Sequence, residues 1–115
     1  MAIPSEIITL INQLNQELER IEQEATNGLN LLAPALSRFP DNAILIHFFA
    51  TLNNVIFLVE TYRRRIQTTS TPLLAADVTT EEIQDTGEEL AAILGVVLEA
   101  KIVVSRVISR LENLP

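Results

Sequence analysis

Three long stretches of the chain repeat apolar residues at alternating steps of three and four. This spacing places the residues on one side of an α-helix, and no stretch shows the strict alternation of a half-buried strand. It therefore predicts an all-α fold of three long helices. The repeats are Ile7, Ile11, Leu14, Leu18, Ile21 and Ala25; then Leu45, Phe48, Leu52, Val55, Val59, Tyr62 and Ile66; then Leu90, Ile93, Val97, Ala100, Val104, Val107, Leu111 and Leu114.

Turn and capping residues set the expected helix ends. We expect the first helix over about residues 5–27, because Gly28 suits the residue just past a helix C-terminus. Residues 29–38 form either a short extra helix with Pro34 in its first turn or a kinked continuation of the first helix. Pro40 ends this region, and Asp41 is the expected cap of a second helix over about residues 42–67.

A linker over about residues 68–78 follows, with Thr, Ser and Pro72 but no period. Thr79 and Glu82 have the spacing of a capping box, and Val78 and Ile83 have that of a hydrophobic staple. The third helix is therefore expected over about residues 80–113. With 115 residues, the chain fits a single domain spanning residues 1–115, an antiparallel up-down-up bundle.

The second and third helices carry more apolar residues than one core-facing side needs. A monomer would leave much of this surface in water, and large exposed apolar patches are typical of association sites. We therefore expect a homodimer in which these two helices form a central layer and the first helix lies outside. The expected contacts are Phe49, Ile56 and Phe57 against Val96 and Val103, and the alternative is a tightly packed monomer.

Composition excludes several classes of function. With a net charge of −7, the chain lacks the basic surface typical of a nucleic-acid-binding protein. It has no cysteine, which excludes a thiolate nucleophile and cysteine-bound zinc. The N-terminus lacks the features of an export signal, so we expect a cytoplasmic protein. The most apolar run, residues 43–59, is interrupted by His47, Asn53 and Asn54, and so we expect no integral membrane span.

Candidate catalytic chemistry is sparse. A single histidine, His47, on a bundle helix coarsely resembles a histidine phosphotransfer domain, but Ala50 stands where that family has a lysine. Acidic residues around Glu81, Asp85 and Glu88 fit the N-terminal end of a helix dipole better than a metal site. We therefore expect no enzyme activity, no metal and no cofactor.

Arg63, Arg64 and Arg65 form the only basic run. They are candidate contacts for a phosphate or an acidic partner. The alternative is that they complement the C-terminal dipole of the second helix and pair with acidic residues across the bundle.

These observations favour a non-catalytic helical interaction module, such as an adaptor, regulator or assembly subunit, that binds itself and a further protein partner. One alternative is a small carrier that holds a lipid-like or planar apolar ligand between its helices. A second alternative is a helical protein that associates with a membrane surface.

Overall fold

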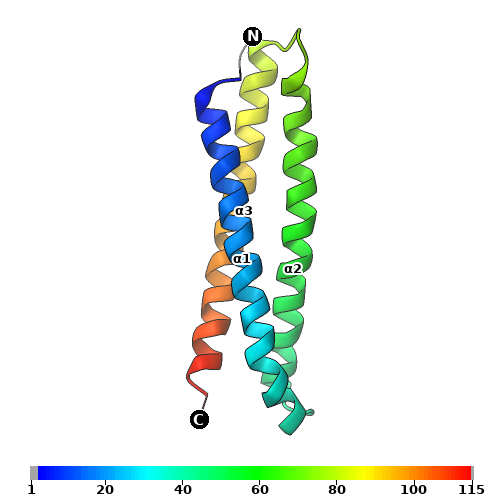
Figure 1. Ribbon diagram of the computed structural model, residues 1–115, viewed down its shortest axis with the longest axis vertical. Coiled ribbons are helices and arrows are strands. Elements are labelled where there is room, and N and C mark those ends of the chain that lie inside the picture. The colour runs from blue at the N-terminus through cyan, green and yellow to red at the C-terminus, as the bar shows by residue number, and fades with distance from the viewer. Residues whose placement is uncertain (1–2, 115) are drawn as a thin grey trace.

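The computed structural model describes residues 3–114, which form three long helices packed against one another (Figure 1). The helices are α1 (Ser5–Arg38), α2 (Ala43–Ser70) and α3 (Thr80–Glu112), and a short 3-10 helix, η1 (Thr71–Leu74), follows α2. No strand occurs among these residues, and so the all-α prediction is confirmed. The bundle is a rod with principal extents of 59 × 19 × 16 Å.

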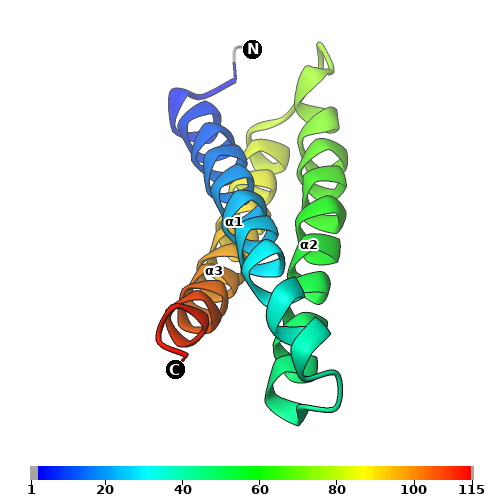
Figure 2. The same ribbon diagram turned by 60° about the horizontal axis from the view of Figure 1, so that its bottom comes forward.

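In Figure 1, α1 descends, α2 returns and α3 descends again. Turned by 60°, Figure 2 shows the lower end of α3 apart from the start of α2, with α1 between them. Contacts between the helices agree with this course. Near the middle of α1, Glu22 contacts Arg63 of α2, and farther down, Gly28 lies against Leu52 of α2 and Ile108 of α3.

α1 is a single helix, and the expected end near residue 27 is wrong. Gly28 is buried and lacks the positive φ of a terminal glycine. A Cβ on Gly28 would lie 2.7 Å from Ile108 Cδ1 and 2.8 Å from Leu52 Cδ1. The glycine therefore serves close packing of three helices. Pro34 lies on an exposed side of the same helix, so residues 29–38 continue α1 rather than form a separate helix.

α2 differs from the expected 42–67 helix at both ends. Its cap is Asn42 and not Asp41, because Asn42 Oδ1 accepts hydrogen bonds from the backbone N–H groups of Ile44 and Leu45, at 3.0 and 3.1 Å. At the other end α2 continues to Ser70 and into η1, where Thr71 Oγ1 donates to the carbonyl of Gln67. The non-helical linker is therefore shorter than predicted.

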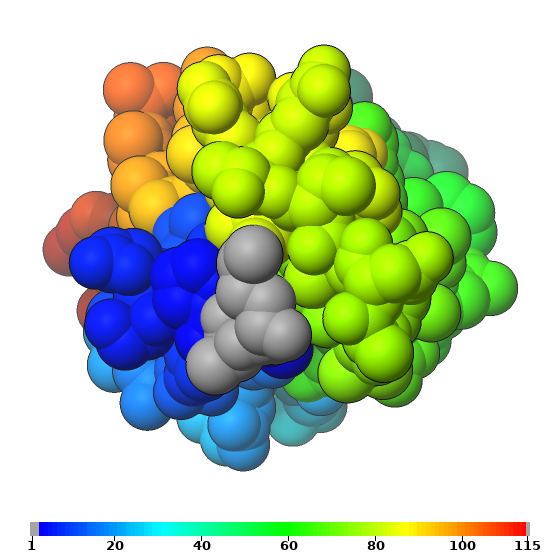
Figure 3. All heavy atoms as spheres, turned by 90° about the horizontal axis from the view of Figure 1, so that it is seen from above, coloured from blue at the N-terminus to red at the C-terminus, as the bar shows by residue number. Residues whose placement is uncertain are grey.

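The linker is anchored by Leu73 and Val78, which are buried. Leu73 lies near Ile3 and Ile11 at the start of the chain. Seen from above, this segment covers the end of the bundle beside the start of α1 (Figure 3). The linker thus closes one end of the core.

α3 begins as predicted. Thr79 Oγ1 accepts a hydrogen bond from the Glu82 N–H at 3.1 Å, and the Glu82 carboxylate accepts one from the same hydroxyl, also at 3.1 Å. Val78 is buried in the core, and Ile83 is partly buried and packs against the same core. The Thr79 cap is confirmed, but Glu82 bonds the Thr79 hydroxyl rather than the backbone N–H of a full capping box. The helix ends within one residue of the expected position.

Most of the core comes from the three predicted repeats, and the buried Leu32, Leu73 and Val78 add to it. All but three of the repeat residues are buried: Ile11 and Tyr62 are partly exposed, and Leu114 lies exposed beyond the end of α3. Burial of one apolar side of each helix is what holds such a bundle together, since isolated helices gain little stability from propensity alone.

Candidate interaction surface

α2 contains the longest run of the chain without a charged residue. Residues 42–59 contain no Asp, Glu, Lys or Arg. Within them Ile46, Phe49 and Phe57 are 47, 49 and 67% exposed. With Asn53 they form a line at steps of three, four and four, which lies on one side of a helix. We call these four residues the α2 stripe.

The α2 stripe faces away from the core. Leu45, Phe48 and Leu52 precede stripe residues by one position and are buried. One helical residue turns the side-chain direction by about 100°. The stripe therefore presents large apolar side chains to solvent on a side of α2 adjacent to the one that packs.

The five predicted interface residues lie on more than one surface. Ile56 is two turns before Arg63, whose Nη1 lies 2.8 Å from Glu22 Oε2 of α1, so Ile56 points toward α1 and is partly buried. Phe49 and Phe57 belong to the α2 stripe, of which Phe49, two turns before Ile56, forms the edge nearer α1.

Val96 and Val103 lie seven and fourteen residues after Glu89, which places all three on one side of α3. Glu89 Oε1 lies 3.7 Å from Arg65 Nη2 of α2, so this side of α3 faces α2. Val96 is partly buried there and Val103 is exposed. The two valines thus lie on the side of α3 that Glu89 shares and are separate from the α2 stripe.

The three arginines have different surroundings. Arg63 contacts both carboxylate oxygens of Glu22, and Arg65 pairs with Glu89 and lies over the Tyr62 ring. Arg64 is exposed and forms none of the ion pairs found among residues 3–114. It follows Ile46 by eighteen residues, which is five full turns, so it lies in line with the α2 stripe.

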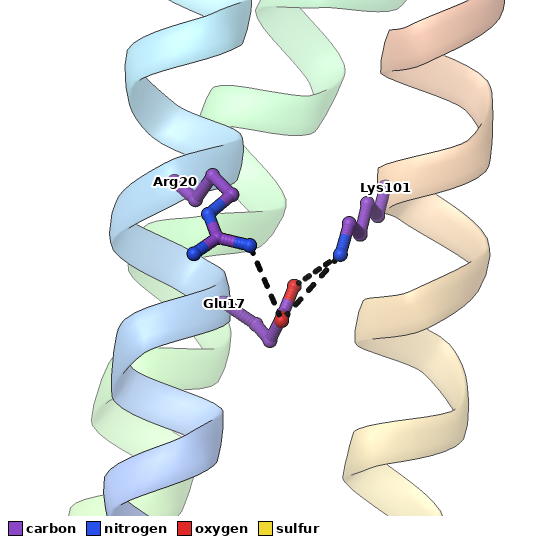
Figure 4. A network of polar contacts seen from close by, with 3 residues as sticks. All are labelled: Glu17, Arg20 and Lys101. Atoms are coloured by element: carbon purple, nitrogen blue, oxygen red, sulfur yellow. Dashed lines mark hydrogen bonds and ion pairs between the residues drawn. The ribbon is translucent and has the colours of Figure 1, made fainter.

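A polar contact between α1 and α3 lies on a different side of the bundle (Figure 4). The Glu17 side chain is only 15% exposed, and its Oε2 lies 3.2 Å from Lys101 Nζ. Arg20 Nη1 is 3.9 Å from Glu17 Oε1, and the Arg20 side chain is 60% exposed. Lys101 is therefore the main partner of this carboxylate.

The lower end of the bundle carries an apolar pocket that the repeats do not reveal. Its volume is about 540 Å³. Arg38 and Asn42 are the polar residues on its wall, and the apolar ones are Leu31, Pro34, Ala35, Phe39, Ile44, Leu45 and Leu114. The signal in the sequence is a set of large apolar residues outside the repeats near the turn, of which Leu31, Phe39 and Ile44 are exposed.

The other candidate residues form no site within the described chain. His47 is exposed on α2. Among residues 3–114, no group of three or more His, Asp or Glu side chains is placed to hold a metal ion. The acidic residues at the start of α3 instead surround the Thr79 cap, with Glu81 and Glu82 in the first turn.

One helical segment, Ala43–Leu74, is long and apolar enough to cross a membrane. A core helix of a bundle meets the same criterion, and so this is weak evidence by itself. Comparison with protein-family models, curated proteins and solved structures finds no match to this chain.

Proposed function

We propose that this chain is a non-catalytic helical interaction module that acts as a homodimer, and that the α2 stripe is its contact surface. The observation that carries the proposal is the exposure of Ile46, Phe49 and Phe57 in one uncharged line on α2. Fully burying one such side chain contributes about 1.5–3 kcal/mol. Aromatic residues near the centre of a contact are also the ones that dominate binding energy.

The shape of the bundle favours a contact along its side. A stable interface buries roughly 800 Å² on each partner. One side of the rod, 59 by 19 Å, offers roughly 1,100 Å², whereas its end, 19 by 16 Å, offers roughly 300 Å². A second copy therefore finds enough area along one side of the rod but too little at the pocket end.

The test is the mass of the particle in solution for the wild type and two matched variants. Phe57→Ser removes the most exposed side chain of the α2 stripe, and Leu74→Ser removes one that is 78% exposed but lies in η1. Neither residue is in the core, so both variants should fold. We expect Phe57→Ser to raise the dimer dissociation constant about a thousandfold, because both copies of the dimer lose this aromatic side chain, at about 2 kcal/mol each.

Leu74→Ser should leave the dissociation constant unchanged, as measured by sedimentation equilibrium. A wild-type chain that remains monomeric at high micromolar concentration contradicts the proposal. Equal weakening by both variants assigns the contact to something other than the α2 stripe.

The pocket at the lower end favours a second candidate function, the carriage of a small apolar ligand. Its walls are mostly apolar, and Arg38 on the wall offers a partner for an anionic head group. This pocket lies beside the turn rather than in the interior between the helices. Native mass spectrometry of purified protein tests it: a bound small-molecule mass that is lost in Leu31→Asp supports carriage, and a bare chain mass opposes it.

Membrane association is the third possibility for the same apolar residues. A flotation assay with neutral and anionic vesicles separates it from self-association. The dimer proposal predicts that the protein stays in the unbound fraction with both neutral and anionic vesicles. Flotation that Phe57→Ser abolishes would assign the α2 stripe to a lipid surface instead.

A further inference from the structure

We infer that the two copies pair in antiparallel orientation, with each α2 crossing the other at Asn53. This inference rests on the proposed homodimer and names its geometry. It makes Asn53 the residue on the twofold axis, packs Phe49 of each copy against the partner's Phe57, and brings Arg64 close to the partner's Asp41.

The two phenylalanines of the α2 stripe are placed symmetrically about Asn53. Phe49 precedes it by four residues and Phe57 follows it by four. An antiparallel pairing therefore places Phe49 opposite Phe57, and a parallel pairing places each residue opposite itself. Both orientations bury the phenylalanines, and so packing alone does not choose between them.

The distribution of charge along the rod favours the antiparallel orientation over the parallel one. The lower end consists of residues 25–59 and 102–114, which contain three arginines and two acidic residues, a net charge of +1. The rest of the chain contains thirteen acidic and five basic residues, a net charge of −8. A parallel dimer places the two −8 regions side by side, whereas an antiparallel dimer places each beside a +1 region. Like charges brought together along a contact oppose association, so the antiparallel orientation is favoured.

Arg64 and Asp41 support the same register. Arg64 follows Asn53 by eleven residues and Asp41 precedes it by twelve, so an antiparallel pairing about Asn53 brings them to the same level. Both are exposed, and neither forms an ion pair with another of residues 3–114. In a parallel dimer, Arg64 would instead face the partner's Arg64.

Asn53 has unused hydrogen-bonding capacity for a contact on the axis. Its Nδ2 donates to the Phe49 carbonyl at 2.9 Å. One amide N–H and the Oδ1 acceptor remain for a partner. Two asparagines that meet across a twofold axis can each donate to the other, which is how a polar residue in an apolar helix contact fixes its register.

Cysteine cross-linking tests the orientation directly, because the natural chain has no cysteine. Asn53→Cys places two thiols on the axis. Phe49→Cys places them eight residues apart along antiparallel helices, which is about 12 Å. A disulfide needs Cα atoms within about 7 Å of each other, so this pair cannot close.

We expect Asn53→Cys, oxidised with diamide, to cross-link at least tenfold faster than Leu74→Cys, which reports random collision. Phe49→Cys and Phe57→Cys should each cross-link no faster than Leu74→Cys alone. When these two stripe variants are mixed, the heterodimer should form rapidly.

The wild-type mass in the same buffer separates failure of this inference from failure of the proposed function. A monomeric wild type overturns both. If the wild type is a dimer, rapid self-linking of Phe49→Cys shows a parallel pairing and overturns the inference alone. A dimer in which no stripe cysteine exceeds the Leu74→Cys rate also overturns it, because the contact then lies on another face.

Discussion

Gly28 lies where α1 is in close contact with both other helices. In sequence it follows an asparagine and resembles a helix end, because glycine is the residue that most often adopts the left-handed backbone there. The structure gives it helical backbone and uses its missing side chain instead. Local patterns do not separate the two roles, since the second depends on Leu52 and Ile108.

Two glycine-to-alanine substitutions compare a glycine that packs between helices with one that has open space around it. Alanine gains about 1 kcal/mol over glycine inside a helix. At Gly95, where no described atom lies within 4 Å of an added Cβ, Gly95→Ala should raise the free energy of unfolding by about this amount. At Gly28 the added methyl must displace Leu52, which is fully buried, and overpacking costs about 1–3 kcal/mol.

Gly28→Ala should therefore lower the free energy of unfolding by about 1 kcal/mol net, as measured by urea denaturation at equal protein concentration. A Gly28→Ala variant more stable than the wild type would show that the three helices are not in close contact there.

The arginine run shows how far single residues can be interpreted from sequence. Because the three arginines lie near the end of the second helix, the sequence suggested that some of them pair with acidic residues across the bundle. Which ones pair depends on the helix phase relative to its neighbours: Arg63 meets α1, Arg65 meets α3 and Arg64 points away from both.

At the scale of the elements, Glu17 and Lys101 link α1 to α3 on the outer edge of the core. A carboxylate that is mostly removed from water needs a partner, and losing it costs about 1–3 kcal/mol. An exposed ion pair such as that with Arg20 contributes about 0–1 kcal/mol.

Lys101→Met keeps the aliphatic stem and removes the charge. We expect it to lower the free energy of unfolding by about 1–3 kcal/mol, whereas Arg20→Met changes it by less than about 0.5 kcal/mol. The double variant Glu17→Gln and Lys101→Met should recover part of the loss, because the neutral amide is less costly to bury. Thermal denaturation at pH 7 measures all three. An equal effect of both single variants would contradict the assigned role of Lys101.

The helices and their buried sides could be predicted because the 3-4 repeat is a local property of the chain. The Thr79 cap could be predicted for the same reason, since its partners lie within four residues. The ends near residues 27 and 67 were wrong. Gly28 packs against the other two helices within a continuous helix, and α2 continues past Gln67 toward the buried Leu73.

At the scale of the whole molecule, the sequence could predict that α2 and α3 carry apolar surface outside the core. It could not predict which neighbouring helix, if any, each of these surfaces faces. That depends on how the three helices are arranged around their common axis. Phe49 and Phe57 consequently belong to a free side of α2, whereas Val96 and Val103 lie toward α2 from α3. The pocket beside Phe39 was missed for a related reason, since it is built from the ends of three helices.

Net charge is also distributed unevenly along the rod, because most acidic residues lie outside its lower end. This separation leaves the α2 stripe in the region with the least net charge. It is the feature that gives the proposed dimer both a surface and an orientation.

Small-angle X-ray scattering of the wild-type chain at about 100 μM, a concentration above the dissociation constant of a typical weak dimer, tests the central claim most directly. The account predicts the mass of two 12.8 kDa chains and a maximum dimension well below twice the 59 Å length of one rod. A particle with the mass of one chain, or a dimer about twice as long as the single rod, would contradict it.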